Sequence, residues 1–179
     1  MPRLIERLLI VVASLAIAIG VIAVLSGGLL AGRDTPGVTG PATGPGVALR
    51  EQGDVHLRPG QLQPVYDSDP PTSGPHVPVA VTTDASRLSD DQLLSALETG
   101  DVVLVYGSAT PPRALTALAR AVAPPFSPPL AASGQAIVLA MRPGTRGVVA
   151  LAWAHMLRVA SPSDPALRAF AQFWLGRGR

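Results

Sequence analysis

The spacing of apolar and polar positions changes several times along the chain, and each change predicts a different kind of segment. Leu8 to Ala31 is an apolar run without charge. It is long enough to cross a bilayer as a helix, which takes about 20 apolar residues. Residues 32–46 are mainly Gly, Pro and Thr and predict a flexible tether. The regular patterns that follow place the folded domain in residues 47–179.

Six elements are predicted in the second half of this domain. Ser89 and Gln92 form an S-x-x-Q capping box at the start of a helix that ends at Gly100. The other predicted elements are a buried strand over 102–106, a helix beginning at Thr110-Pro111 and stopped by Pro124-Pro125, strands over 135–141 and 148–159, and a last helix capped by Asp164-Pro165. Pro128-Pro129 is predicted to interrupt regular structure a second time, after Pro124-Pro125. The short connection containing Pro143-Gly144 predicts that the last two strands form an antiparallel hairpin.

This order of elements predicts a small mixed sheet flanked by helices. The fold class is therefore α/β, with α+β as the alternative, preceded by one N-terminal transmembrane helix. The same order occurs in the later part of thioredoxin-like folds. The chain contains no cysteine, so such a likeness would concern shape and not redox chemistry.

The charges around the apolar run predict its orientation. Arg3 and Arg7 precede it, and the positive-inside rule then places residues 1–7 in the cytoplasm and the domain outside. The alternative is a cleaved signal peptide, whose apolar region is usually only about 7–15 residues long. We favour an uncleaved anchor, which makes the membrane a partner and predicts a single-pass protein of the cell membrane.

The basic composition does not indicate nucleic-acid binding. The net charge is only +2, every basic residue is an arginine, and the arginines are scattered singly among few aromatic residues. Phosphate backbones are bound by a concentrated basic face, which this pattern lacks.

A turn-rich segment stands between the tether and the regular elements. Its prolines fix the backbone and its glycine allows positive φ, so it presents its side chains rigidly. We expect a binding surface formed by Tyr66, Pro70, Pro71, Thr72, Ser73, Gly74, Pro75 and His76. A non-enzymatic binding module is the leading hypothesis, because loops on a rigid scaffold are common binding sites. Ser73 and His76 as nucleophile and base are disfavoured, since no G-x-S-x-G elbow is present.

Two histidines support an alternative function, metal binding. His56 and His76 both lie in predicted loops, and Glu98 or the aspartates Asp54, Asp67 and Asp69 could add oxygen ligands. Imidazoles with carboxylates suit zinc or copper, although sequence spacing does not show that the residues meet. His155 lies beside Trp153 in a predicted strand and is interpreted as structural.

Four segments resemble a bacterial family known as domain of unknown function 3105, from about Gln52 to the C-terminus. They are Gln52-Gly53-Asp54-Val55-His56 with Pro59-Gly60, the segment from Tyr66 to His76, Leu97-Glu98-Thr99-Gly100, and Ala152-Trp153. The resemblance implies a single N-terminal anchor with the domain outside, and no established activity.

The same resemblance implies a cluster of histidines. Relatives typically carry one near the opening, one at the end of the proline-rich segment and two around a Leu-Glu-His-Gly segment. In this chain the last two positions are Ser95 and Thr99, while His56, His76 and Glu98 remain. We therefore expect that any metal site uses these three residues, with zinc or copper as the ion.

Overall fold

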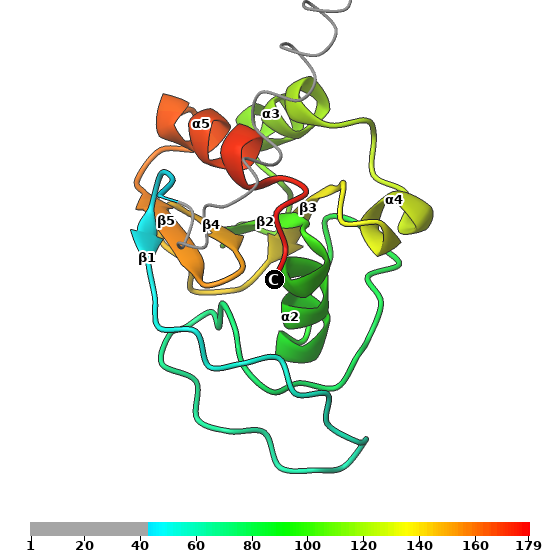
Figure 1. Ribbon diagram of the computed structural model, residues 1–179. Coiled ribbons are helices and arrows are strands. Elements are labelled where there is room, and N and C mark those ends of the chain that lie inside the picture. Colours follow the sequence, from blue (N-terminus) through cyan, green and yellow to red (C-terminus); the bar gives the residue numbers. More distant parts are fainter. Residues whose placement is uncertain (1–42) are drawn as a thin grey trace, which may run out of the picture. The chain divides into compact units, whose positions relative to one another are not determined.

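A five-stranded mixed sheet forms the centre of the computed structural model, which describes residues 43–179 as one compact unit (Figure 1). The strands are β1 (Val47–Ala48), β2 (Val102–Tyr106), β3 (Ile137–Met141), β4 (Val148–Ala152) and β5 (His155–Val159). Their order across the sheet is β1-β5-β4-β2-β3. β2 and β3 are parallel, whereas the other neighbours are antiparallel. The predicted mixed α/β architecture is confirmed.

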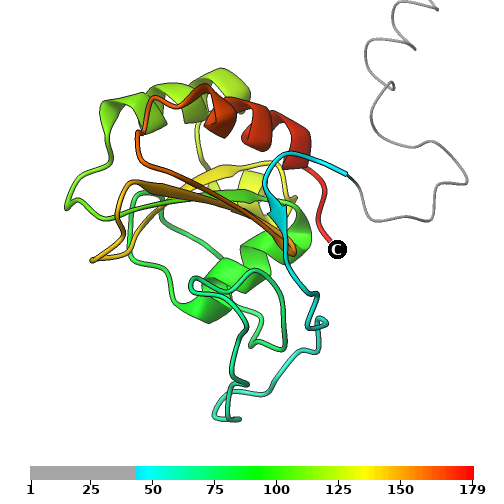
Figure 2. The ribbon, with the colours of Figure 1, turned by 90° about the vertical axis from the view of Figure 1, so that its left-hand side faces the viewer.

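Helices cover both faces of the sheet, as Figure 2 shows from the side. One face packs on α3 (Arg113–Val122) and α5 (Pro165–Trp174), through residues such as Leu115, Leu167 and Phe170. The other face packs on α2 (Asp90–Thr99) and α4 (Pro128–Ala132), through residues such as Leu94 and Leu97. β2 is buried along its whole length because it lies between these two apolar layers.

Several predicted elements are confirmed in detail. The side chain of Ser89 accepts a hydrogen bond from Gln92 N while the Gln92 side chain binds Ser89 N, which is the predicted capping box of α2. Asp164 caps α5 by accepting from Ala166 N. β2 and β3 are joined through α3 and α4, which together form the crossover that parallel pairing requires.

The predicted hairpin is wrong, and so is the single strand over 148–159. Residues 148–159 form two antiparallel strands, β4 and β5, separated by a tight turn at which Ala154 has φ +55°. β3 and β4 do not pair with each other, because β2 lies between them. The turn carries neither glycine nor proline, so the continuous apolar pattern concealed it.

Three predicted boundaries also shift. α3 begins at Arg113, after Pro112, rather than at Thr110-Pro111. Pro128 and Pro129 form the first turn of α4 instead of only breaking the chain, since proline is well tolerated at the start of a helix. The last residues of the predicted tether pack on α5, where Trp174 Nε1 donates to Pro45 O at 2.8 Å.

Residues 49–88 contain neither a helix nor a paired strand, and we call this segment the wrap. It begins beside β1 at one edge of the sheet and ends at the other, where Met141 N donates to Ser86 O at 2.9 Å. Between these points it runs along the face that carries α2, where Val81 joins the apolar core. The predicted anchor, Leu8–Ala31, lies outside the described residues. Within residues 43–179, no helix combines the length and apolarity needed to cross a membrane.

Candidate metal centre

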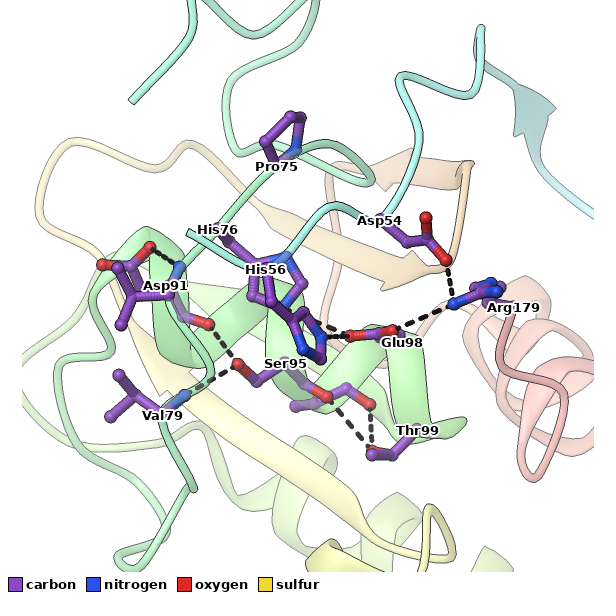
Figure 3. Close-up of polar contacts among 12 residues, drawn as sticks. Asp54, His56, Pro75, His76, Val79, Asp91, Ser95, Glu98, Thr99 and Arg179 are labelled. Carbon is purple, nitrogen blue, oxygen red and sulfur yellow. Dashed lines mark hydrogen bonds and ion pairs between the residues drawn. The ribbon is translucent and has the colours of Figure 1, made fainter. Parts of the chain in front are cut away.

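Two extended segments of the wrap bring His56 and His76 side by side. They form an isolated parallel bridge, in which Leu57 N donates to His76 O at 2.8 Å and His76 N donates to Val55 O at 3.1 Å. The two imidazole rings meet edge to face with centroids 5.4 Å apart. Both rings point toward the last turn of α2, where Glu98 lies (Figure 3). Backbone pairing therefore fixes two of the three predicted metal ligands relative to each other.

One carboxylate oxygen faces both imidazoles. Glu98 Oε2 lies 2.9 Å from His56 Nε2 and 3.3 Å from His76 Nε2. One ligand atom from each of the three residues can be chosen so that all lie within 4.8 Å of one another. The site is graded in exposure, since the His56 side chain is 52% exposed, Glu98 17% and His76 0%. The structure thus brings together the set that sequence spacing alone could not show to converge.

The hydrogen bonds of His76 define which nitrogen carries a proton. Its Nδ1 lies 3.0 Å from Gly74 O. A carbonyl oxygen can only accept, so Nδ1 must be the donor in this contact. The Nε2 atom is buried and has no hydrogen-bond partner among the described residues. It faces Glu98 Oε2 across 3.3 Å. A neutral His76 therefore directs an unshared electron pair at a carboxylate oxygen.

The backbone around His76 is held by Tyr66, whose hydroxyl donates to Pro75 O at 2.8 Å. Burial, together with the charges of Asp91 and Asp90, raises the pKa of Tyr66 to about 12. The phenol therefore stays protonated and remains a donor at any physiological pH. Gly74 has φ +126°, and a Cβ at this position would approach the Tyr66 ring to 3.0 Å. The segment accordingly needs glycine at residue 74.

On its other side, Glu98 meets a basic residue that sequence reasoning did not identify. Arg179 Nη1 lies 3.6 Å from Glu98 Oε1 and forms an ion pair with Asp54 Oδ2. Arg179 N also donates to Glu98 O at 3.1 Å, which lays the end of the chain against the last turn of α2. No local motif signals this contact, because Asp54 and Arg179 lie at opposite ends of the domain sequence.

The proline-rich segment supports the site from inside the domain. Residues 70–74 and His76 are buried, whereas Tyr66 and Pro75 are partly exposed. Ser73 Oγ accepts from Gln52 N at 3.0 Å and donates to Arg50 O at 3.4 Å, so its hydrogen bonds go to the wrap and not to His76. Residues 70–74 therefore contribute to internal packing, and Tyr66 and Pro75 are the members of the expected binding surface that reach solvent in part.

The two positions at which the family resemblance implies histidine both lie on α2. Ser95 Oγ donates to Asp91 O at 2.8 Å and accepts from Val79 N at 3.0 Å. Thr99 Oγ1 donates within the helix, with Ala96 O at 2.9 Å. The Thr99 hydroxyl thus bonds within its own helix, whereas the Ser95 hydroxyl also bonds to the wrap. His155 lies away from this cluster and stacks on Trp174 with ring centroids 3.8 Å apart, which fits its structural interpretation.

A family model described as "Protein of unknown function (DUF3105)" matches residues 61–178. The chain therefore belongs to this family, as its motifs indicated. The matched region contains His76 and Glu98 but begins after His56, so it is shorter than the resemblance from Gln52 onward that the sequence suggested. No curated protein and no solved structure matches the chain.

Proposed function

We propose that this chain is a membrane-anchored, non-enzymatic binding domain whose ligand is a divalent transition-metal ion held by His56, His76 and Glu98. The observation that carries the proposal is the contact between His76 Nε2 and Glu98 Oε2. These two atoms face each other at 3.3 Å, and the buried nitrogen has no hydrogen bond.

The contact between His76 Nε2 and Glu98 Oε2 requires a positive charge, either on the imidazole itself or on an ion between the two atoms. With Nδ1 committed to Gly74 O, a neutral His76 has only an electron pair to offer to Glu98. Two acceptors at this distance repel, and a buried polar atom without a partner costs about 1–3 kcal/mol. A metal ion relieves both problems, because it accepts an electron pair from each atom. The competing explanation is a second proton on His76, which would make the contact an ordinary ion pair.

The ligand types favour the metal, and the distances are compatible with it. In a tetrahedral site with bonds of about 2.0–2.1 Å, neighbouring ligand atoms lie about 3.4 Å apart. The contacts of 2.9 and 3.3 Å from Glu98 Oε2 to the two imidazoles are close to that spacing. Two imidazoles and one carboxylate form a borderline donor set that suits zinc or copper. The Gly74 carbonyl would act as the outer partner that orients the His76 ring.

Metal titration of the full chain, purified in detergent without an affinity tag and stripped with a chelator, tests this proposal. We expect one equivalent of Zn²⁺ or Cu²⁺ in competition with a chromogenic chelator. His56→Ala should weaken binding at least about tenfold without unfolding, because the side chain is half exposed. Glu98→Gln should act similarly, whereas His155→Gln, which alters a histidine outside the cluster, should bind like the wild type. Absence of binding, or equal binding by His56→Ala and His155→Gln, would overturn the proposal.

The location is proposed from the sequence. Leu8–Ala31 would anchor the chain in the cell membrane, with residues 1–7 cytoplasmic and the folded domain outside. Fusion of a periplasm-active reporter after residue 179 should give activity in cells, and a cytoplasm-active reporter at the same position should not. The reverse result would contradict the proposed orientation.

We also propose that the fold from β2 onward is thioredoxin-like. The order of its elements supports this, since the parallel β2–α3–β3 unit is followed by antiparallel β4 and β5 and then by α5. The proposal concerns shape alone, because the sequence contains no cysteine for thiol chemistry. An experimental structure in which β4 did not pair with β2 would contradict it.

A further inference from the structure

We infer that Asp54 is a fourth ligand of the proposed metal site and that Arg179 is a resident counter-cation which the incoming ion replaces. This inference depends on the metal-binding function proposed above. It is carried by a separate observation, the arrangement of Asp54, Arg179 and Glu98 in Figure 3. The set would then contain two imidazoles and two carboxylates.

Asp54 lies where a fourth ligand is needed. It precedes His56 by two residues on the same extended segment, and alternate residues of an extended chain point to the same side. In Figure 3 the His56 imidazole points toward Glu98, and the Asp54 carboxylate is directed toward Arg179, which also contacts Glu98. Asp54 Oδ2 is buried and receives no hydrogen bond within residues 43–179. Its charged partner there is the guanidinium of Arg179. Buried carboxylate oxygens normally accept several hydrogen bonds, so this atom has unused capacity.

Arg179 marks the point at which the two carboxylates converge. Its Nη1 atom pairs with Asp54 Oδ2 and lies 3.6 Å from Glu98 Oε1. A guanidinium has no electron pair to donate and stays protonated, so it cannot itself coordinate a metal. Its side chain is 58% exposed, and exposed ion pairs are weak. Arg179 can therefore leave toward solvent when a stronger cation arrives.

The charges favour this exchange over simple addition. Asp54 and Glu98 bring two negative charges, and Arg179 balances one of them. A divalent ion bound beside Arg179 would leave a positive excess in a partly buried place, which is unfavourable. An ion that replaces Arg179 is neutralised by the two carboxylates. Asp54 must then move closer to the imidazoles, since it is not part of the set of atoms within 4.8 Å.

Zinc titration of full-length variants tests this inference. Asp54→Asn should weaken Zn²⁺ binding about tenfold or more, because the amide is a poor substitute for a carboxylate ligand. Arg179→Gln should strengthen binding about two- to fivefold, which is the size expected for an exposed ion pair. Asp67→Asn and Arg120→Gln, which change exposed residues of the same types, serve as matched controls and should leave the affinity unchanged.

A second readout distinguishes coordination from a structural role. With Co²⁺ in place of zinc, the visible absorption spectrum reports the ligand set directly. It should differ between wild type and Asp54→Asn, and it should be unchanged in Asp67→Asn. If wild type binds zinc through His56 but Asp54→Asn matches Asp67→Asn in affinity and spectrum, this inference fails while the proposed function stands. If wild type binds no zinc, both fail.

Discussion

The wrap and the body of the domain, which comprises α2 through α5, achieve order by different means. The body buries continuous apolar side chains on both faces of the sheet, with residues such as Leu104 and Phe170 fully enclosed. The wrap has no helix and supplies few residues to the core, yet it carries both site histidines. In this fold the apolar body supplies stability and Glu98, and the irregular segment supplies the two histidines of the proposed site.

The wrap is held by hydrogen bonds at separate points. Ala154 N donates to Thr72 O at 3.0 Å, and Trp153 Nε1 donates to Glu51 Oε1 at 3.0 Å. Val77 N donates to Asp91 Oδ1 at 2.9 Å, which fixes the segment just beyond His76 to the first turn of α2. Such bonds contribute about 0.5–1.5 kcal/mol each, less than a buried aromatic side chain. Substitutions in the body should therefore change global stability, whereas those in the wrap should mainly change the site.

The largest expected loss of stability comes from a substitution in the body, Phe170→Ala. Phe170 is fully buried beneath the sheet, and large-to-small changes of this kind cost about 3–5 kcal/mol. Denaturant unfolding should show a loss of that size. Zinc affinity of the protein that remains folded should be unchanged, because the site lies on the opposite face. A matching loss of zinc affinity would show that body and wrap are not separable.

The next largest effect on stability is expected at Asp101, where the wrap packs against the body; we call this contact region the seam. Asp101 is buried beside a cavity of about 360 Å³ that residues 78–81 of the wrap share with α2 and α4. Burial raises the pKa of Asp101 from 3.8 to about 7, partly opposed by the hydrogen bond that its Oδ1 accepts from Ala136 N. The folded protein thus keeps this proton up to about pH 7, while the unfolded chain loses it near pH 4. The stability linked to this group is fully present below about pH 4 and is lost as the pH rises toward 7.

Asp101→Asn should remove this pH dependence, because the amide oxygen retains the bond to Ala136 N and carries no charge. The stability of the variant relative to wild type should rise between pH 4 and pH 8 by up to about 4 kcal/mol, at about 1.4 kcal/mol for each unit of pKa shift. Thermal or denaturant unfolding across this range measures the difference. A difference independent of pH would contradict the burial of an ionising group at the seam.

The smallest expected effect on stability comes from the wrap itself, through Gly74→Ala. The residue has φ +126° and would place a Cβ against Tyr66, so we expect a cost of about 1–3 kcal/mol. Zinc affinity should fall as well, because the Gly74 carbonyl orients His76. Gly60→Ala is a matched control, since φ there is +86° and no atom lies within 4 Å of the added carbon. If both variants bind zinc equally, the carbonyl does not orient the imidazole.

Local signals in the sequence predicted most of the body and little of the wrap. The capping box at Ser89 and the Asp164-Pro165 cap identified two helices, because caps depend on neighbouring residues. The order of the strands depends on contacts between distant segments, which such local signals do not report. In the structure β2 lies between β3 and β4, so these two strands do not form the predicted hairpin. Side-chain chemistry and the family resemblance indicated His56, His76 and Glu98. Their convergence depends on a backbone bridge between distant segments, which composition and periodicity do not encode.

The ends of the wrap have a consequence for solubility. A sheet edge with unpaired backbone groups can recruit a strand from another molecule, which is a common route to aggregation. The short β1 occupies the edge at β5, and the bridge from Ser86 to Ala140 shields part of the edge at β3. β1 and the Ser86 bridge, which flank the segment that positions the imidazoles, thereby limit strand exchange between neighbouring copies.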